Sequence, residues 1–274
     1  MPATPGSAVT IGVYDGLHIG HRRVIDELCR LAREEGLESV VVTFDRHPAS
    51  VVRPESAPLQ LTDLPQRLEL LTSTGVDDVF VLEFTEERAA ESAEDFVDEV
   101  LVGQLRARVV LVGRDFHFGR GRGGNVALLE RMGAERGFRV QPCDLVADDH
   151  DQEVVSSTRI RALISAGDMA EAARLLGRPH EVRGLVVAEA SGHSGAGEGS
   201  AGVSVDIPPT IILPPPGGYE AKAGLVGAAG VPLQQVHVMV PPRGGDMAVV
   251  GLAELWSPGS PVRVLFTPAR DAKE

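Results

Sequence analysis

The stretch VTIGVYDGLHIGHRRVI, residues 9–25, joins a short apolar run to an Asp-Gly turn, two histidines and a helix-like pattern. The helix that begins near His21 offers backbone N–H groups and the positive end of its dipole. His18 and His21 add hydrogen-bond donors at the same place. The stretch therefore predicts a polyphosphate site between a first strand and a first helix. Three glycines in it let the backbone approach a ligand closely: Gly12, Gly16 and Gly20.

A histidine at a helix start can also be a purely structural residue whose polar atoms are satisfied by the helix end. The pattern His-x-Gly-His, placed after a strand and a glycine-bearing turn, favours the ligand-binding interpretation for both rings. The stretch lacks the Gly-Lys-Ser/Thr of a P-loop and the glycine spacing of a dinucleotide-binding turn. Kinase or ATPase chemistry by the P-loop route is therefore disfavoured.

From residue 8 to about 176, short runs rich in Val and Phe alternate with helical patterns, which predicts a parallel sheet covered by helices. Gly36 is placed to end the first helix, and Ser92 with Asp95 fits a capping box at the third. The predicted strands are Val9–Val13, Ser39–Phe44, Asp78–Phe84, Arg108–Gly113 and Phe138–Val146. The predicted helices are His21–Gly36, Pro65–Gly75 and Ser92–Leu105.

After Gly177 the pattern changes to short Val-rich segments with many prolines and glycines, which predicts antiparallel strands of a small barrel or sandwich. Ser191–Gly202 is predicted as a loop, and Pro208–Gly218 is too rich in proline for a central strand. The predicted strands are Glu181–Ala190, Val236–Val240, Met247–Leu255 and Pro261–Phe266. We expect an α/β chain with a Rossmann-like parallel-sheet domain over residues 1–180 and a small all-β domain over residues 181–274.

The composition narrows the classes of partner. The formal net charge of −13 argues against general nucleic-acid binding, although a local site for a nucleotide stays compatible with it. No apolar run approaches the roughly 18 residues of a membrane span, and no secretory signal is recognised. The two cysteines, Cys29 and Cys143, have no metal-like spacing. We expect a cytoplasmic protein with no nucleic-acid or membrane partner; a homo-oligomer is compatible with the sequence.

Three further stretches carry polar or aromatic groups at the ends of predicted elements: VTFDRHP (42–48), VGRDFHFGRGRGGNVALL (112–129) and the segment 154–187 that begins VVSSTRIRALI. In the third, Ser156, Ser157 and Thr158 stand at the start of a helix, where hydroxyls and N–H groups favour phosphates, and Arg161 adds a positive fork. A plain N-cap role for Ser157 is the alternative. Residues 119–125 predict a mobile loop beside the phosphates.

With these motifs on the page, DGLHIGH resembles the signature of the HxGH nucleotidyltransferase superfamily. The four stretches together resemble, over about residues 8–187, the N-terminal half of the prokaryotic bifunctional riboflavin kinase/FAD synthetases. That half is an FMN adenylyltransferase. The resemblance implies transfer of AMP from ATP to FMN with release of pyrophosphate, and Mg²⁺ accompanying ATP.

The resemblance also implies roles for individual residues, and it assigns no metal ligand. The implied catalytic residues are His18, His21 and Arg161. The implied nucleotide-binding residues are Gly12, Tyr14, Asp15, Gly20, Asp115, Ser157 and Thr158. The implied flavin-binding residues are Phe44, His47, Phe116 and Phe118, of which the last two are equally compatible with the core.

The sequence departs from the family pattern at three positions. Arg46 replaces a usual Pro, His117 a common Arg, and Tyr14 a common Phe. These departures leave the triphosphate-binding groups intact and fall around the acceptor side. A modified flavin phosphate as acceptor, CTP as nucleotide, or a non-catalytic flavin or nucleotide sensor therefore stay open as alternatives.

The C-terminal part resembles the riboflavin kinase domain of the same proteins, which is a six-stranded barrel. The kinase signature contains Pro-Thr-Ala-Asn, whose Thr and Asn hold the magnesium nucleotide, and a later Glu serves as base. Here Pro209-Thr210 is followed by Ile211-Ile212, and Glu254 is out of register. An isoleucine cannot supply the oxygen ligand that Mg²⁺ needs, so we predict a barrel without kinase activity.

Overall fold

The computed structural model describes residues 6–143, 153–189, 201–228, 231–242, 246–252 and 256–267. The chain divides into two compact units, which we describe separately. The first comprises residues 1–58 and 64–155, and the second comprises residues 59–63 and 156–274. Among the described residues, no helix has both the length and the apolar character that crossing a membrane requires.

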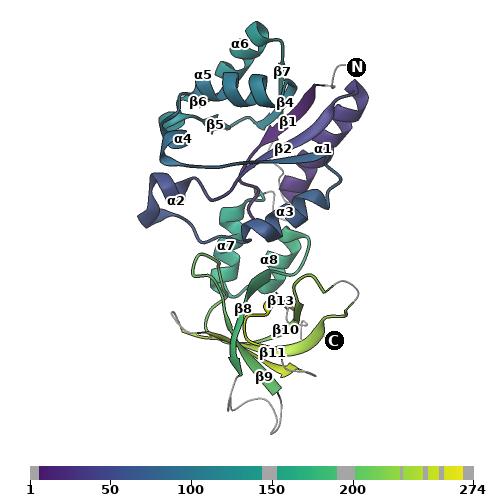
Figure 1. Cartoon of the computed structure of the whole chain (residues 1–274), viewed down its shortest axis with the longest axis vertical. Coiled ribbons are helices and arrows are strands. Elements are labelled where there is room, and N and C mark those ends of the chain that lie inside the picture. The colour runs from purple at the N-terminus through teal and green to yellow at the C-terminus, as the bar shows by residue number, and fades with distance from the viewer. Residues whose placement is uncertain are drawn as a thin grey trace. The chain divides into compact units, whose positions relative to one another are not determined.

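The first unit is built on a five-stranded parallel sheet in the order β3-β2-β1-β4-β7 (Figure 1). The predicted parallel sheet is confirmed, with strand ends within a few residues of the predicted ones. The last predicted strand extends beyond Cys143 into residues that lie outside the described ones. The strands are β1 (Ser7–Ile11), β2 (Glu38–Phe44), β3 (Asp78–Leu82), β4 (Ala107–Gly113) and β7 (Arg139–Cys143).

Helices cover both faces of this sheet because alternate strand residues point to opposite sides. Val9 and Val110 belong to one apolar cluster, which the Phe96–Leu101 segment covers. Ala8 and Val109 belong to the other, which α1 and α3 cover. The helical elements are α1 (Ile19–Glu35), α2 (Ala49–Val52), η1 (Pro54–Ser56), α3 (Leu64–Thr72), α4 (Glu86–Ala90), α5 (Ala93–Phe96), η2 (Val97–Gln104) and α6 (Val126–Arg136).

The predicted helix signals are confirmed where they concern termini. Gly36 ends α1 in the left-handed region at φ 66°, and its N–H donates to the carbonyls of Ala32 and Arg33. The Ser92 hydroxyl accepts from the Asp95 N–H at 3.0 Å and donates to the Asp95 carboxylate at 2.6 Å. These caps satisfy backbone groups that a helix end leaves without partners.

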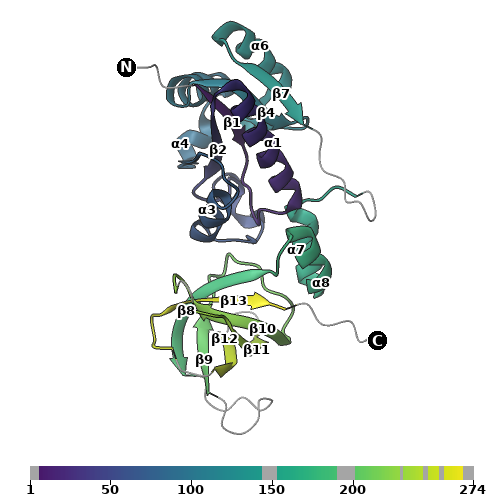
Figure 2. The ribbon, with the colours of Figure 1, turned by 90° about the vertical axis from the view of Figure 1, so that its right-hand side faces the viewer.

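The second unit begins with α7 (Ser157–Ala166) and α8 (Met169–Leu176) and continues into a closed six-stranded barrel, ordered β10-β11-β12-β9-β8-β13 (Figure 2). The predicted small all-β domain is thus a barrel. Val236, Val238 and Val240 alternate into its interior. The strands are β8 (Glu181–Glu189), β9 (Ala201–Asp206), β10 (Gly217–Leu225), β11 (Gln234–Val240), β12 (Met247–Leu252) and β13 (Pro261–Phe266).

Two strands of the barrel differ from the prediction. Strand β9 was not predicted, and its first two residues, Ala201 and Gly202, fall in the predicted loop 191–202. Strand β10 was not predicted, because its Gly-Gly start and its alanines carry little strand preference. Pairing with β11 and β13 on both sides makes it a strand. The rest of the predicted loop, and Glu254, lie outside the described residues.

Candidate active site

The turn between β1 and α1 lies at the carboxyl end of the central strand. The chain leaves β1 toward β2 on one side, whereas β4 pairs with β1 on the other, so the strand order reverses there. In open α/β sheets, ligands bind beyond the carboxyl ends of strands at such a reversal. The predicted site therefore occupies the position that the topology favours.

The backbone of this turn adopts unfavourable conformations. Tyr14 has φ 52° and Leu17 has φ 37°, and Gly16 between them has φ 80°. Left-handed residues other than glycine cost of the order of 1–3 kcal/mol each and persist where the surrounding structure enforces them. The fully buried side chain of Leu17 provides such an anchor. Strain of this kind is concentrated at functional sites.

The two histidines of the motif are stacked on each other at the helix start. Their ring centroids are 3.5 Å apart with an interplanar angle of 19°. His18 is the N-cap residue of α1, and its Nδ1 accepts a hydrogen bond from the His21 N–H at 3.3 Å. A neutral His18 therefore carries its ring proton on Nε2.

Burial and the neighbouring His18 ring lower the pKa of His21 well below its ordinary value. His21 is consequently neutral near pH 7, with one ring N–H to donate. Its Nδ1 is buried and has no hydrogen-bond partner among the described residues. A buried polar atom without a partner is costly, and such atoms are commonly found where a ligand completes the site.

Tyr14 holds the other side of His21. Its ring meets His21 edge to face, with centroids 5.1 Å apart. Its hydroxyl shares a 2.7 Å hydrogen bond with Thr10 of β1. Burial raises the pKa of the Tyr14 phenol, which stays protonated throughout the physiological range. Asp15, the next residue, is 2% exposed. The Tyr14 ring therefore packs against His21 and fixes the orientation of the imidazole.

Two of the three motif glycines lie in tight contact with the rings of the site. A Cβ at Gly12 would lie 3.0 Å from the Tyr14 ring, and a Cβ at Gly20 would lie 3.1 Å from Nδ1 of His18. The position at Gly20 is also 3.5 Å from the carbonyl oxygen of Val155. The glycines thus leave room for the aromatic and imidazole rings, in addition to any approach by a ligand.

Replacing Gly20 with alanine is expected to displace the His18 ring by a few tenths of an ångström without unfolding the protein. Alanine favours a helix over glycine by up to about 1 kcal/mol, which offsets the crowding. The NMR chemical shifts of the imidazole nitrogens measure the displacement of the His18 ring, and the unfolding midpoint measures the change in stability. Asp26→Ala, at an exposed position of the same helix, is the control. Unmoved His18 signals in Gly20→Ala would contradict the tight contact.

The predicted flavin residues Phe44 and His47 follow β2. Phe44 is half-buried, and its ring meets Phe84 edge to face at 5.4 Å. The Nδ1 atom of His47 accepts a hydrogen bond at 3.1 Å from the N–H of Ala49, the first residue of the short helix α2. Arg46 forms an ion pair with Asp45 at 2.8 Å. A flavin-binding role for Phe44 and His47 remains a prediction.

Residues 114–125 contain a hairpin, β5 (His117–Phe118) and β6 (Gly124–Asn125), joined through η3 (Arg120–Arg122). That residues 119–125 form a mobile loop beside the phosphates remains a prediction. The rings of Phe116 and Phe118 stack at 5.4 Å, and both pack against the cluster that contains Val9. Asp115 is exposed, and its carbonyl oxygen lies 2.7 Å from Nδ1 of His117. The core interpretation of the two phenylalanines thus has support, whereas their contact with a flavin remains a prediction.

The predicted phosphate-binding residues of α7 belong to the second unit. Ser156 is the N-cap, with its hydroxyl accepting from the Arg159 N–H at 3.2 Å, so Ser157 does not have the capping role. Ser157 and Thr158 occupy the first turn. Nε of Arg161 donates to the carbonyl of Leu59 at 2.6 Å. Their binding of ATP phosphates remains a prediction.

Sequence reasoning did not single out Thr10 or Arg67. A polar residue within the apolar run of β1 was an available signal for Thr10. Arg67 lies in an amphipathic segment where an arginine normally faces solvent, yet it is 1% exposed. It donates to the carbonyls of Val13 at 3.2 Å and Phe44 at 2.6 Å.

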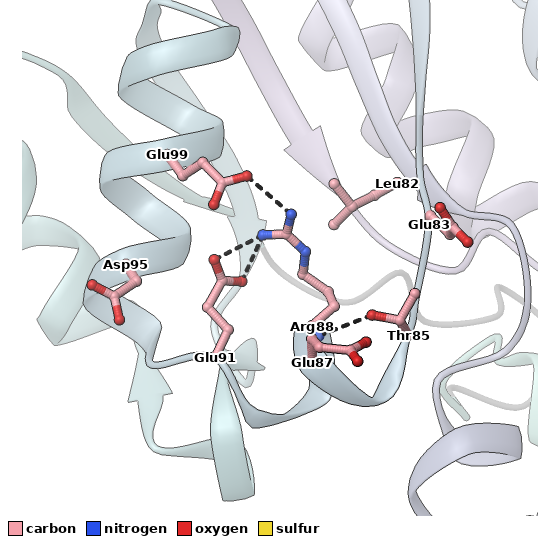
Figure 3. A pocket seen from close by; sticks show the side chains of 8 residues that line it. All are labelled: Leu82, Glu83, Thr85, Glu87, Arg88, Glu91, Asp95 and Glu99. Atoms are coloured by element: carbon pink, nitrogen blue, oxygen red, sulfur yellow. Dashed lines mark hydrogen bonds and ion pairs between the residues drawn. The ribbon is translucent and has the colours of Figure 1, made fainter.

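A second concavity of the first unit is a poor phosphate site (Figure 3). Its single cation, Arg88, forms ion pairs with Glu91 at 2.7 Å and Glu99 at 3.0 Å. The surplus of carboxylates repels anionic ligands. The ion pair between Arg88 and Glu99 instead joins α4 to η2. The pocket is lined by Leu82, Glu83, Thr85, Glu87, Arg88, Glu91, Asp95 and Glu99.

Parallel strands, a glycine-bearing turn and a stacked His-x-Gly-His pair at a helix start agree with the resemblance of this unit to the HxGH nucleotidyltransferase class. A family model described as FAD synthetase matches residues 1–159. Because this match covers more than half of the 274 residues, the chain belongs to the FAD synthetase family.

Curated relatives support the same grouping. A bifunctional riboflavin kinase/FMN adenylyltransferase of Escherichia coli K12 is 35% identical over 182 residues, which are 66% of this chain and 58% of that protein. The protein of that name from Pseudomonas fluorescens is 38% identical over 186 residues, 68% of this chain and 59% of the relative. The chain therefore matches just under three fifths of the length of these relatives.

A solved structure shares the fold of the whole chain. It is titled as a macrolide-efflux protein from Streptococcus pneumoniae and has a TM-score of 0.76, covering 100% of this chain and 88% of that one. The sequence identity is 24%, so the likeness concerns the fold alone.

Proposed function

We propose that this protein transfers AMP from ATP to FMN, which forms FAD and releases pyrophosphate. The observation that carries the proposal is the stacked pair of His18 and His21 on a strained turn, in a chain of the FAD synthetase family. We assign the transfer to residues 1–180, as predicted from the sequence, and we assign the kinase-like barrel to residues 181–274.

The proposed reaction is an in-line displacement. A phosphate oxygen of FMN attacks the α-phosphorus of ATP, and the bond from that phosphorus to the oxygen bridging the α- and β-phosphates breaks. The electron pair of this bond leaves with pyrophosphate, so no covalent bond to the protein is needed. Catalysis then consists of positioning the two reactants and stabilising negative charge in the transition state.

The histidine pair suits this role. Nε2–H of His18 and the ring N–H of neutral His21 would donate hydrogen bonds to oxygens whose charge grows during the transfer. The N-terminal N–H groups of α1 would add to the favourable field. Both rings are held before a ligand arrives, by their mutual stacking and by Tyr14. Such preorganised donors are the largest single contribution in many enzymes.

We expect Mg²⁺ to enter with ATP. Mg²⁺ is usually held by one or two carboxylates together with substrate phosphates and water. In the part of the chain that the structure describes, no group of three His, Cys, Asp or Glu side chains is placed to hold a metal ion. The donor set thus fits a metal bound chiefly through the nucleotide, where it would neutralise phosphate charge.

The barrel is proposed to lack riboflavin kinase activity. Ile211 and Ile212, which stand where Ala-Asn would be needed, are 7% and 4% exposed. The N–H of Ile212 donates to the Gln60 carbonyl at 2.9 Å, and its carbonyl oxygen lies 3.0 Å from Nε2 of the buried His180. These residues serve core packing and backbone pairing, and neither offers a side-chain oxygen to a metal.

The full chain is expected to convert FMN, ATP and Mg²⁺ into FAD and pyrophosphate, and to form no FMN from riboflavin, ATP and Mg²⁺. Separation of the flavins by chromatography, with a pyrophosphate assay, measures both reactions. Replacing ATP by CTP in a parallel incubation tests the nucleotide.

The outcomes separate the alternatives. Formation of a flavin dinucleotide and pyrophosphate with CTP, and none with ATP, would show that CTP is the nucleotide substrate. Binding of FMN and ATP without any pyrophosphate would point to a sensor. Formation of FMN from riboflavin would show that the barrel is an active kinase that holds its metal by other residues.

A further inference from the structure

Arg67 of α3 is among the largest fully buried side chains of the protein. Its guanidinium donates from Nη1 to the carbonyl of Val13 at 3.2 Å and from Nη2 to the carbonyl of Phe44 at 2.6 Å. One side chain therefore connects the chain segments that follow β1 and β2. Burying a cation is unfavourable unless hydrogen bonds compensate for the lost water, so its retention here calls for a reason.

The two carbonyls lie beyond the end of the ladder between β1 and β2, although Phe44 is the last residue of β2 and still pairs with Leu82 of β3. The parallel ladder between β1 and β2 ends at Ile11 and Val42, and the Gly12 N–H still donates to the Val42 carbonyl at 3.0 Å. Beyond that point the Thr43 hydroxyl donates to the Val13 carbonyl at 3.1 Å. Arg67 adds the next connection, so it continues the link between the two segments past the last rung of the β1–β2 ladder.

Both segments lead directly into candidate site residues. Val13 precedes Tyr14, the first left-handed residue of the strained turn that carries His18 and His21. Phe44 is followed by the Asp45–Pro48 segment, which contains His47. Holding these two carbonyls in place therefore fixes the positions at which the strained turn and the Asp45–Pro48 segment begin.

We infer that Arg67 is a positioning residue. Its two hydrogen bonds, which we call the brace, hold the turn that carries His18 and His21 against the Asp45–Pro48 segment after β2. The brace thereby sets the distance between the two histidines and the predicted flavin-binding side of the site. The inference rests on the proposed function for its kinetic consequence, but not for its geometry. A planar guanidinium is suited to this because its two amino groups have a fixed separation.

The test compares Arg67→Lys and Arg67→Met with Leu71→Ala in the full chain. Lysine keeps the charge but cannot hold two carbonyls in a fixed fork, and methionine removes both hydrogen bonds. Leu71, also on α3 and 0% exposed, belongs to the core cluster with Leu28. Its truncation destabilises the same helix without touching the brace. All proteins are measured well below their unfolding midpoints.

Two readouts are followed. The first is the imidazole nitrogen signals of His18 and His21 in the ligand-free protein, assigned with single His→Gln variants. The second is the rate of FAD formation at saturating ATP and FMN. We expect both sets of signals to move in Arg67→Lys, with kcat lowered roughly 10-fold, and about 100-fold in Arg67→Met, since misplacement by 1 Å has effects of this size. Leu71→Ala should lower only the unfolding midpoint.

Unchanged signals and kcat in Arg67→Lys would overturn the inference, as would equal changes in Leu71→Ala. If Arg67→Met does not fold, Arg67→Lys carries the test. A wild-type chain that forms no FAD would refute the proposed function, whereas the imidazole signals would still report on the brace. The two failures are therefore distinguishable.

Discussion

Replacing His18 or His21 with alanine is expected to lower kcat for FAD formation by roughly 100-fold or more, about 3 kcal/mol in the barrier. Each substitution removes a donor to phosphate oxygens on which negative charge grows. The fold should survive, because the pair lies at the end of a strand and not within the sheet. Steady-state rates, with circular dichroism as the check on folding, measure the effect.

His18 needs a further control because it also caps α1. Losing an N-cap costs about 1 kcal/mol of stability, and asparagine is among the best capping residues. His18→Asn is therefore expected to recover the stability lost in His18→Ala while kcat stays low. Recovery of kcat together with stability would assign His18 a structural role only. Near-normal turnover in both alanine variants would refute the proposed site.

Replacing Arg161 with alanine is expected to weaken ATP binding roughly 10- to 100-fold, the range for a hydrogen bond to a charged group, and to change FMN binding little. The predicted role of Arg161 is to hold the ATP phosphates together with Ser157 and Thr158. Its hydrogen bond to the Leu59 carbonyl holds the side chain in place. Isothermal titration with each ligand separates the two affinities.

Arg159→Ala is the matched control. Arg159 is on the same helix, and Nη2 of its guanidinium lies 3.5 Å from the carboxylate of Glu171. Its removal takes away the same charge without the predicted phosphate contact, so ATP affinity should change far less. An equal loss for ATP and FMN in Arg161→Ala would indicate a general disruption of the helix start instead of a phosphate site.

Local signals in the sequence were sufficient for much of the first unit. The Val-rich runs are buried strands because all-parallel sheets are apolar on both faces. Gly36 ends α1, and Ser92 caps the third predicted helix, because these residue types satisfy helix ends by short-range bonds. The order of motifs was likewise sufficient for the family. The strand and cap signals depend on neighbours within a few positions along the chain, whereas the order of the motifs extends over about residues 8–187.

Other features could not be predicted because they depend on distant segments. Strand β10 exists through pairing with β11 and β13, and its own glycines and alanines do not favour a strand. The stacking of His18 on His21, and the edge contact with Tyr14, depend on left-handed backbone angles that the sequence does not announce for Tyr14 or Leu17.

The residue pattern was sufficient to predict the class of fold, the place of the histidine pair after the first strand and, from Ile211-Ile212, a barrel that lacks the Asn of the kinase signature. Only the tertiary structure decided that Arg67, which reads as a surface charge on an amphipathic helix, is buried and joins the ends of two strands. The physical reason is that periodicity reports which face of an element is apolar. It does not report which carbonyls another element leaves within reach of a side chain.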